Sequence, residues 1–127
     1  GDCQVREEIN PIPSTVNKFD TEIAGVSEGN IPQSMITVGG PCANAVTSAL
    51  MGNPEVCDEG FDSGMALLKL IEDGDNIALI VAGGTGPDTR IASTVLQNFD
   101  EYADELTGSE LRLTTVSESN IGFEQVE

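Results

Sequence analysis

Three cysteines have the most distinctive chemistry in this chain. They are Cys3, Cys42 and Cys57, and because the chain has no histidine and no Cys-x-x-Cys motif, a zinc site is disfavoured and a Cys/His nucleophilic pair is excluded. A disulfide between Cys42 and Cys57 would close a loop of about 15 residues and stabilise the fold by roughly 3 kcal/mol. The alternative is three reduced thiols in a cytosolic protein. We favour the disulfide, which leaves Cys3 as a candidate for an intermolecular disulfide.

Two groups of acidic residues could supply oxygen ligands to calcium. One group is Asp58, Glu59 and Asp62, and the other is Glu72, Asp73 and Asp75. Neither spacing matches an EF-hand loop, and a solvated acidic face is the commoner explanation for such groups. Calcium is the one candidate cofactor, and its weak candidate ligands are Asp58, Glu59, Asp62, Asp73 and Asp75.

Two glycine pairs could carry binding chemistry, because a glycine turn that opens a helix can cradle phosphate. Gly39-Gly40 and Gly83-Gly84 each follow a predicted strand, but the chain has neither a GxGxxG nor a Gly-Lys-Ser/Thr motif. Backbone freedom and close packing of helix on strand are the preferred explanation. If the two strands pair in parallel, the corners adjoin and form a candidate ligand corner of Gly39, Gly40, Gly83, Gly84 and Asp88.

The residues needed for catalysis are largely missing. Without histidine, the chain lacks the commonest general base and cannot form a Ser-His-Asp triad, and it also has no Ser-x-x-Lys motif. We therefore predict that the protein is not an enzyme. A weaker alternative is a cytosolic enzyme with a reactive thiol at Cys42, where a helix N-terminus would favour the thiolate.

The charge balance restricts the partners. The chain has 22 acidic and 5 basic residues, and its net charge is -17. Nucleic acid is excluded as a partner because phosphate neutralisation needs a basic patch, and an anionic membrane surface is disfavoured for the same reason. Self-repulsion is tolerated in high salt, or where divalent cations bridge carboxylates of neighbouring molecules. No apolar run is long enough for direct membrane insertion by this segment.

The chain is predicted to form a single domain with an irregular beginning. Residues 1–34 contain three prolines and, at Gly25 and Gly29, glycines within the segment, which predicts an irregular N-terminal segment with short strands, one of them near residues 14–18. Residues 35–127 are predicted to form the core. A buried strand at 35–38 leads into a helix with Pro41 in its first turn, and Gly52-Asn53-Pro54 ends that helix. A loop follows at 53–65, with Phe61 as its core anchor.

The remaining elements begin with a hairpin. Strands at 66–71 and 76–82 flank the turn signal Asp73-Gly74, and the second strand is apolar without alternation, as expected for a strand covered on both faces. A helix capped by Thr85 and Asp88 then runs to Gly108 along an apolar stripe. Short strands follow near Leu111 and Ile121. Two strand-Gly-Gly-helix units plus a hairpin predict a small layered α/β domain with a mixed β-sheet and two main helices.

Several segments together resemble a known family. The stretch Ile-Thr-Val-Gly-Gly-Pro-Cys-Ala-Asn at 36–44 resembles a signature of archaeal surface-layer (S-layer) proteins. Similar pieces occur in the family's order at 10–12, 20–23, 60–61, 64, 68–70 and 88–90. The likeness runs from about residue 9 to the end of the chain. Family members are commonly several times longer, so the chain could be part of a longer protein or a short homologue.

The resemblance implies an extracellular, cell-surface structural protein without catalytic residues to transfer, and it favours the oxidised Cys42–Cys57 pair. We predict an S-layer-like domain that self-assembles as a homo-oligomer into a coat lattice or a filament. The alternative is a small-ligand-binding α/β module that uses the glycine-rich strand-to-helix corners.

Overall fold

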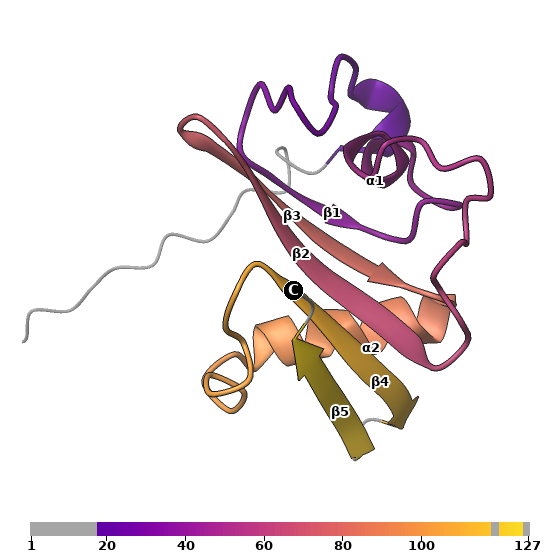
Figure 1. The fold of residues 1–127 in the computed structure, drawn as a ribbon, viewed down its shortest axis with the longest axis vertical. Coiled ribbons are helices and arrows are strands. Elements are labelled where there is room, and N and C mark those ends of the chain that lie inside the picture. Colours follow the sequence, from indigo (N-terminus) through magenta and orange to yellow (C-terminus); the bar gives the residue numbers. More distant parts are fainter. Residues whose placement is uncertain (1–17, 118–119, 126–127) are drawn as a thin grey trace, which may run out of the picture.

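A computed structural model describes residues 18–117 and 120–125, and its centre is one five-stranded mixed sheet (Figure 1). Cys3 and most of the predicted extended piece at 14–18 lie outside the described residues. The strands are β1 (Met35–Val38), β2 (Met65–Asp73), β3 (Asn76–Gly83), β4 (Glu110–Ser117) and β5 (Asn120–Gln125). The helices are the short 3-10 helix η2 (Asp20–Glu22), α1 (Ala45–Leu50) and α2 (Gly86–Gln97). The predicted α/β class with two main helices is confirmed.

The sheet has the order β1-β3-β2-β4-β5. β1 and β3 pair in parallel with Met35 opposite Ala78, whereas the other three pairings are antiparallel. The β2–β3 hairpin is confirmed, and its ladder extends to Asp73 opposite Asn76. Only Gly74 and Asp75 remain for the turn, and Gly74 has a φ of 63°, the left-handed conformation that such a two-residue turn requires.

β3 is covered on both faces, which explains why its sequence does not alternate. Ala78, Ile80 and Ala82 point into a cluster with residues of α1 and the loop residue Phe61. Val81 points the other way into a second cluster, to which α2, β2 and β4 contribute. The sheet therefore lies between α1 on one face and α2 on the other (Figure 1).

α1 begins later than predicted. Pro41 lies in a turn before the helix, and Asn44 is the N-cap residue: its side-chain oxygen accepts hydrogen bonds from the backbone N–H groups of Val46 and Thr47. Asp20 accepts a third, from the N–H of Ala45 at 2.7 Å. The first-turn position predicted for Pro41 is therefore wrong, because an asparagine side chain satisfies the free N–H groups of the helix start.

α2 ends at Gln97 rather than at Gly108. Residues 99–105 form turns, and Phe99, which was predicted to lie on the buried stripe, is 59% exposed. Acidic residues are dense just after the helix, at Asp100, Glu101, Asp104 and Glu105, where the negative end of the helix dipole disfavours them. At the other end, the predicted cap is confirmed, because the Asp88 N–H donates to Thr85 Oγ1 at 3.3 Å.

The residues just before β1 are fastened to the hairpin turn. Ile31 is 1% exposed, and its N–H donates to Asp73 Oδ2 at 2.8 Å. The Ile31 carbonyl accepts a hydrogen bond from Asn76 Nδ2 at 2.9 Å. Asp73 and Asn76 are the two residues that flank the turn, so the side chains of the hairpin turn hold the entry into β1 in place.

This attachment makes a matched pair of substitutions informative. Ile31→Ala should lower the free energy of unfolding by about 2–5 kcal/mol, because it leaves a cavity in the core. Ile36→Ala removes the same atoms from a side chain that is 61% exposed, and should cost less than about 1 kcal/mol. Urea denaturation of the dilute protein measures both. Equal losses would contradict the placement of Ile31 in the core.

Candidate functional site

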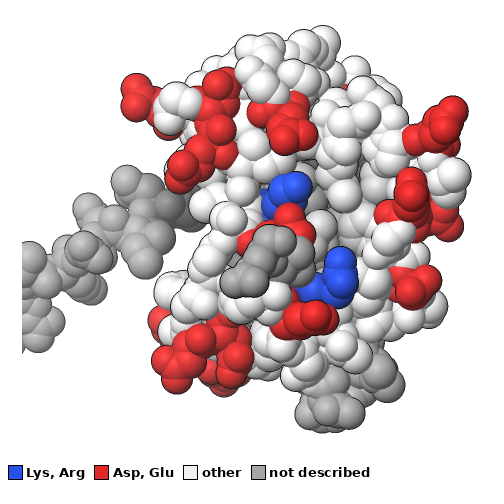
Figure 2. Space-filling view, in the orientation of Figure 1, with Lys and Arg blue, Asp and Glu red and all other residues white. Residues whose placement is uncertain are grey.

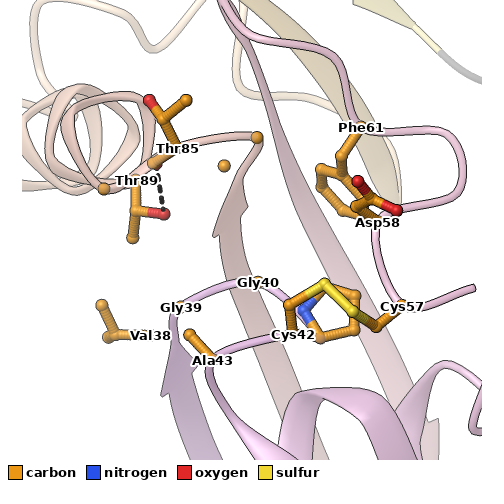
Figure 3. A pocket seen from close by; sticks show the side chains of 14 residues that line it. Val38, Gly39, Gly40, Cys42, Ala43, Cys57, Asp58, Phe61, Thr85 and Thr89 are labelled. Carbon is orange, nitrogen blue, oxygen red and sulfur yellow. Dashed lines mark hydrogen bonds between the residues drawn. A yellow bond between two sulfur atoms is a disulfide. The ribbon is translucent and has the colours of Figure 1, made fainter.

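The two glycine corners lie side by side and line one pocket of about 290 Å³ (Figure 3). Because β1 and β3 pair in parallel, their carboxyl ends lie at the same end of the sheet, and the Gly39 N–H donates to the Val81 carbonyl at 2.8 Å. The predicted adjacency of the corners is therefore present. The lining also includes the Cys42–Cys57 pair, Phe61 and Thr89.

A disulfide joins Cys42 to Cys57 across the rim of this pocket, with a Cα–Cα distance of 5.0 Å. Cys42 lies in the turn between β1 and α1, and Cys57 lies in the loop between α1 and β2. Figure 3 shows that the same loop carries Asp58 and Phe61 along the opposite wall. The disulfide thus joins two residues that are 15 positions apart in the sequence, and it holds the loop against the glycine corner.

The glycines are required by close packing. A Cβ at Gly83 would collide with the backbone of Asp88 and Thr89 at the start of α2, and one at Gly84 would collide with the backbone of Asp62. A Cβ at Gly40 would lie 3.0 Å from the Gly83 carbonyl oxygen. Close contact between backbone segments therefore accounts for these glycines, which supports the packing explanation.

Asp88 does not line the pocket with the four glycines. Its side chain is buried, with the residue 4% exposed, and one carboxylate oxygen accepts hydrogen bonds from the Gly64 N–H at 3.0 Å and from Thr85 Oγ1 at 2.8 Å. These contacts tie the end of the α1–β2 loop to the first turn of α2. Asp88 therefore positions the two walls of the corner and offers no oxygen to a ligand in the pocket.

The pocket is poorly suited to an anion. Among its lining residues, Asp58 carries the only charge, and no lysine or arginine is present. The Thr89 hydroxyl donates to the Thr85 carbonyl at 3.3 Å, so one of the polar groups of the wall is engaged within the protein (Figure 3). A phosphate would meet a carboxylate here, without a positive side chain to offset the repulsion.

The predicted acidic groups do not assemble into metal sites. Within the described part of the chain, no three carboxylates or thiols come together in a way that could hold a metal ion. This applies to the group at Asp58, Glu59 and Asp62 and to the group at Glu72, Asp73 and Asp75. Asp73 instead binds the Ile31 N–H. Carboxylates alone thus do not form a ligand set at either group, and calcium binding, within one molecule or between molecules, stays a prediction.

On the face of the sheet opposite α2, basic side chains of β2 and β4 have acidic neighbours. Lys69 on β2 forms an ion pair with Glu110 on β4 at 3.4 Å, and Arg112 lies opposite Glu124 of β5 in the ladder. In Figure 2 the basic atoms lie near the middle of this face, whereas acidic side chains surround them and occupy the rim. On this face of the described surface, acidic side chains thus adjoin the basic ones.

One surface was missed by the sequence reasoning. Residues 29–54 contain no charged residue at all, in a chain with 27 charged residues, and they include β1, the first glycine corner and α1. β3 also lacks charge. Ile36 and Val38 of β1 and Ile77 of β3 are exposed apolar residues on the face that α2 covers elsewhere. The signal that could have revealed this surface is the gap between Glu28 and Glu55.

None of the helices in the described residues is both long and apolar enough to cross a membrane.

The glycine packing leads to a matched prediction. Gly84→Ala should lower the free energy of unfolding by about 1–3 kcal/mol, because the added methyl group overlaps the Asp62 backbone. Gly86→Ala places the same methyl group in open space at the first residue of α2, and should leave stability unchanged or raise it slightly. Thermal or urea unfolding of both variants measures the difference, and equal stabilities would refute the packing explanation.

The disulfide gives a second prediction for this site. Replacing Cys42 and Cys57 by serine should lower the free energy of unfolding by about 3 kcal/mol, because the open chain gains loop entropy. The comparison is made in a Cys3→Ser background, which excludes exchange through that thiol. Mass measurement after alkylation should show both thiols only when reductant is added. Alkylation of both without reductant would disprove the bond.

Comparison with known proteins identifies one family. A family model described as "S-layer like family, outer domain" matches residues 4–99. The match contains every element from η2 to α2 and ends before β4 and β5, so the likeness stops short of the chain's end, where the sequence analysis had extended it. Neither a curated protein nor a solved structure matches the chain.

Proposed function

Because the chain belongs to the S-layer-like family, as its outer domain, we propose that it is an extracellular structural protein that self-assembles into a cell-surface coat or a filament. The observation that carries this proposal is the family match over the segment that forms β1, α1, β2, β3 and α2. The family has a structural role at the cell surface. Self-assembly with copies of the same chain is the finer step that we add.

The site supports contact rather than chemistry. The glycines of the two corners allow close backbone packing, and Asp88 is engaged with Gly64 and Thr85. The disulfide fits an oxidising, extracellular compartment. The described part of the chain thus holds the elements that stiffen a domain, and Asp58 is the single carboxylate among the described residues that line the pocket between its corners. These features favour a load-carrying domain without catalytic function.

The charge of the protein determines the conditions under which copies can meet. A net charge of -17 on 127 residues repels other copies strongly at low ionic strength. Acidic side chains in exposed positions, such as Glu59 and Asp62 in the α1–β2 loop, are available to cations. Divalent cations that bridge carboxylates of two molecules, or high salt that screens them, would remove this barrier.

Small-ligand binding is the alternative, and the shared pocket at the two glycine corners is the observation that favours it. The ligand would have to be uncharged or cationic, because Asp58 is the charged group of the lining.

Assembly is tested directly by titrating the purified protein with calcium at constant ionic strength. We expect light scattering to rise and negative-stain images to show ordered sheets or filaments, which chelation of calcium should reverse. Sodium chloride at matched ionic strength is the control that separates bridging from screening. A protein that stays monomeric at every calcium and salt concentration would contradict the proposed function.

A further inference from the structure

The two edges of the sheet formed by the described strands belong to β1 and β5. Among the residues that the structure describes, β1 pairs only with β3 and β5 pairs only with β4. An open edge presents backbone N–H and C=O groups that can pair with another strand. On β1, the Gly39 N–H points inward to Val81, so strand alternation directs the N–H groups of Ile36 and Val38 outward.

The two edges have opposite strand directions. β1 runs parallel to β3, β2 runs opposite to β3, β4 runs opposite to β2, and β5 runs opposite to β4. β5 is therefore antiparallel to β1. A second copy placed beside the first in the same orientation brings its β5 to β1 in the antiparallel sense, which allows a regular ladder to continue from one molecule into the next.

The side chains of the two edges also match. Ile36 and Val38 lie opposite Leu79 and Val81, so they point to the α2 face of the sheet. Ile121 and Phe123 of β5 point to the same face and pack against the α2-side cluster. In two adjoining copies with the same orientation, these four apolar side chains would form one row. That row would cover Ile36 and Val38, which are 61% and 55% exposed in the single molecule.

Charge favours this edge over the rest of the surface. β1 lies within the stretch 29–54, which has no charged residue. In a protein with a net charge of -17, contact is least costly where acidic side chains are fewest. The acidic residue on β5, Glu124, alternates with Phe123 and so points to the opposite face from the apolar row.

Given the proposed function, on which this inference rests, we propose that β1 of one copy adds antiparallel to β5 of the next and extends the sheet from subunit to subunit. The contact joins two different edges, so it is a head-to-tail contact that continues from copy to copy instead of ending at a dimer. The right-handed twist of β-sheets turns each copy relative to the last, so the row of copies is a helical filament.

A charge placed in the apolar row tests the contact. Val38→Glu should raise the protein concentration needed for assembly by about tenfold or more, because an added carboxylate would be buried beside the neighbouring β5. Val56→Glu is the matched control: Val56 is 57% exposed and lies in the α1–β2 loop. The concentration that the Val56→Glu variant needs for assembly should stay within about twofold of that of the unmodified protein. Circular dichroism verifies the fold, and Ile36→Glu replaces Val38→Glu if the latter does not fold.

Photocrosslinking identifies the partner strand. With p-benzoylphenylalanine in place of Ile36, irradiated assemblies should yield the tryptic peptide of residues 19–69 joined to that of residues 113–127, which contains β5. This link is intermolecular, because β1 and β5 are four strand spacings of about 4.8 Å apart within one sheet. A link to the peptide of residues 7–18, or between two copies of 19–69, would overturn the proposed pairing.

These experiments distinguish a failure of the β1–β5 contact from a failure of the proposed structural function. If the unmodified protein never assembles, both proposals fail. If it assembles and Val38→Glu assembles equally well, only the β1–β5 contact is refuted, and the structural role stands. Loss of assembly in Val38→Glu together with the 113–127 crosslink supports both.

Discussion

The parallel pairing of β1 with β3 is the contact on which the rest of the structure depends. It brings the carboxyl ends of both strands to the same end of the sheet, so the two glycine corners meet and share a pocket. It also places α1 and α2 on opposite faces of the sheet. Since β2 occupies the other side of β3, β1 has one neighbour among the described strands, and the same pairing leaves it at the edge of their sheet.

Local signals predicted much of this fold from the sequence. The apolar run of β3 is read correctly because it is buried on both sides, and the Asp73-Gly74 turn fixes the hairpin by its own backbone geometry. The glycine corners were recognised because they join strand to helix. Their tight packing against Asp62 and Asp88 could not be read from the sequence, because it depends on segments about 5 to 22 residues away in the chain that only the fold brings close.

The ends of the helices were the least predictable features. The side chains that determine where a helix begins or ends lie outside its apolar stripe, and some of them are far away in sequence. α1 begins where Asn44 and Asp20 can cap it, and Asp20 is 25 residues away in sequence. α2 ends at Gln97 although apolar residues continue at helical spacing, and Tyr102 and Leu106 pack against the same cluster from the segment that follows the helix. The acidic groups illustrate a related point: neighbours in sequence need not point to one place, and within the described residues no three acidic side chains gather in a way that could hold a metal ion.

The distribution of charge connects the fold to its proposed use. An evenly acidic protein would have no preferred place for a second copy, because repulsion would be similar everywhere. Here the longest uncharged stretch coincides with the strand that has an open edge, and exposed apolar side chains lie along it. Repulsion over the remaining surface then disfavours other contacts. The four residues of β1 bury too little area to make a specific contact by themselves, and this repulsion supplies part of the specificity.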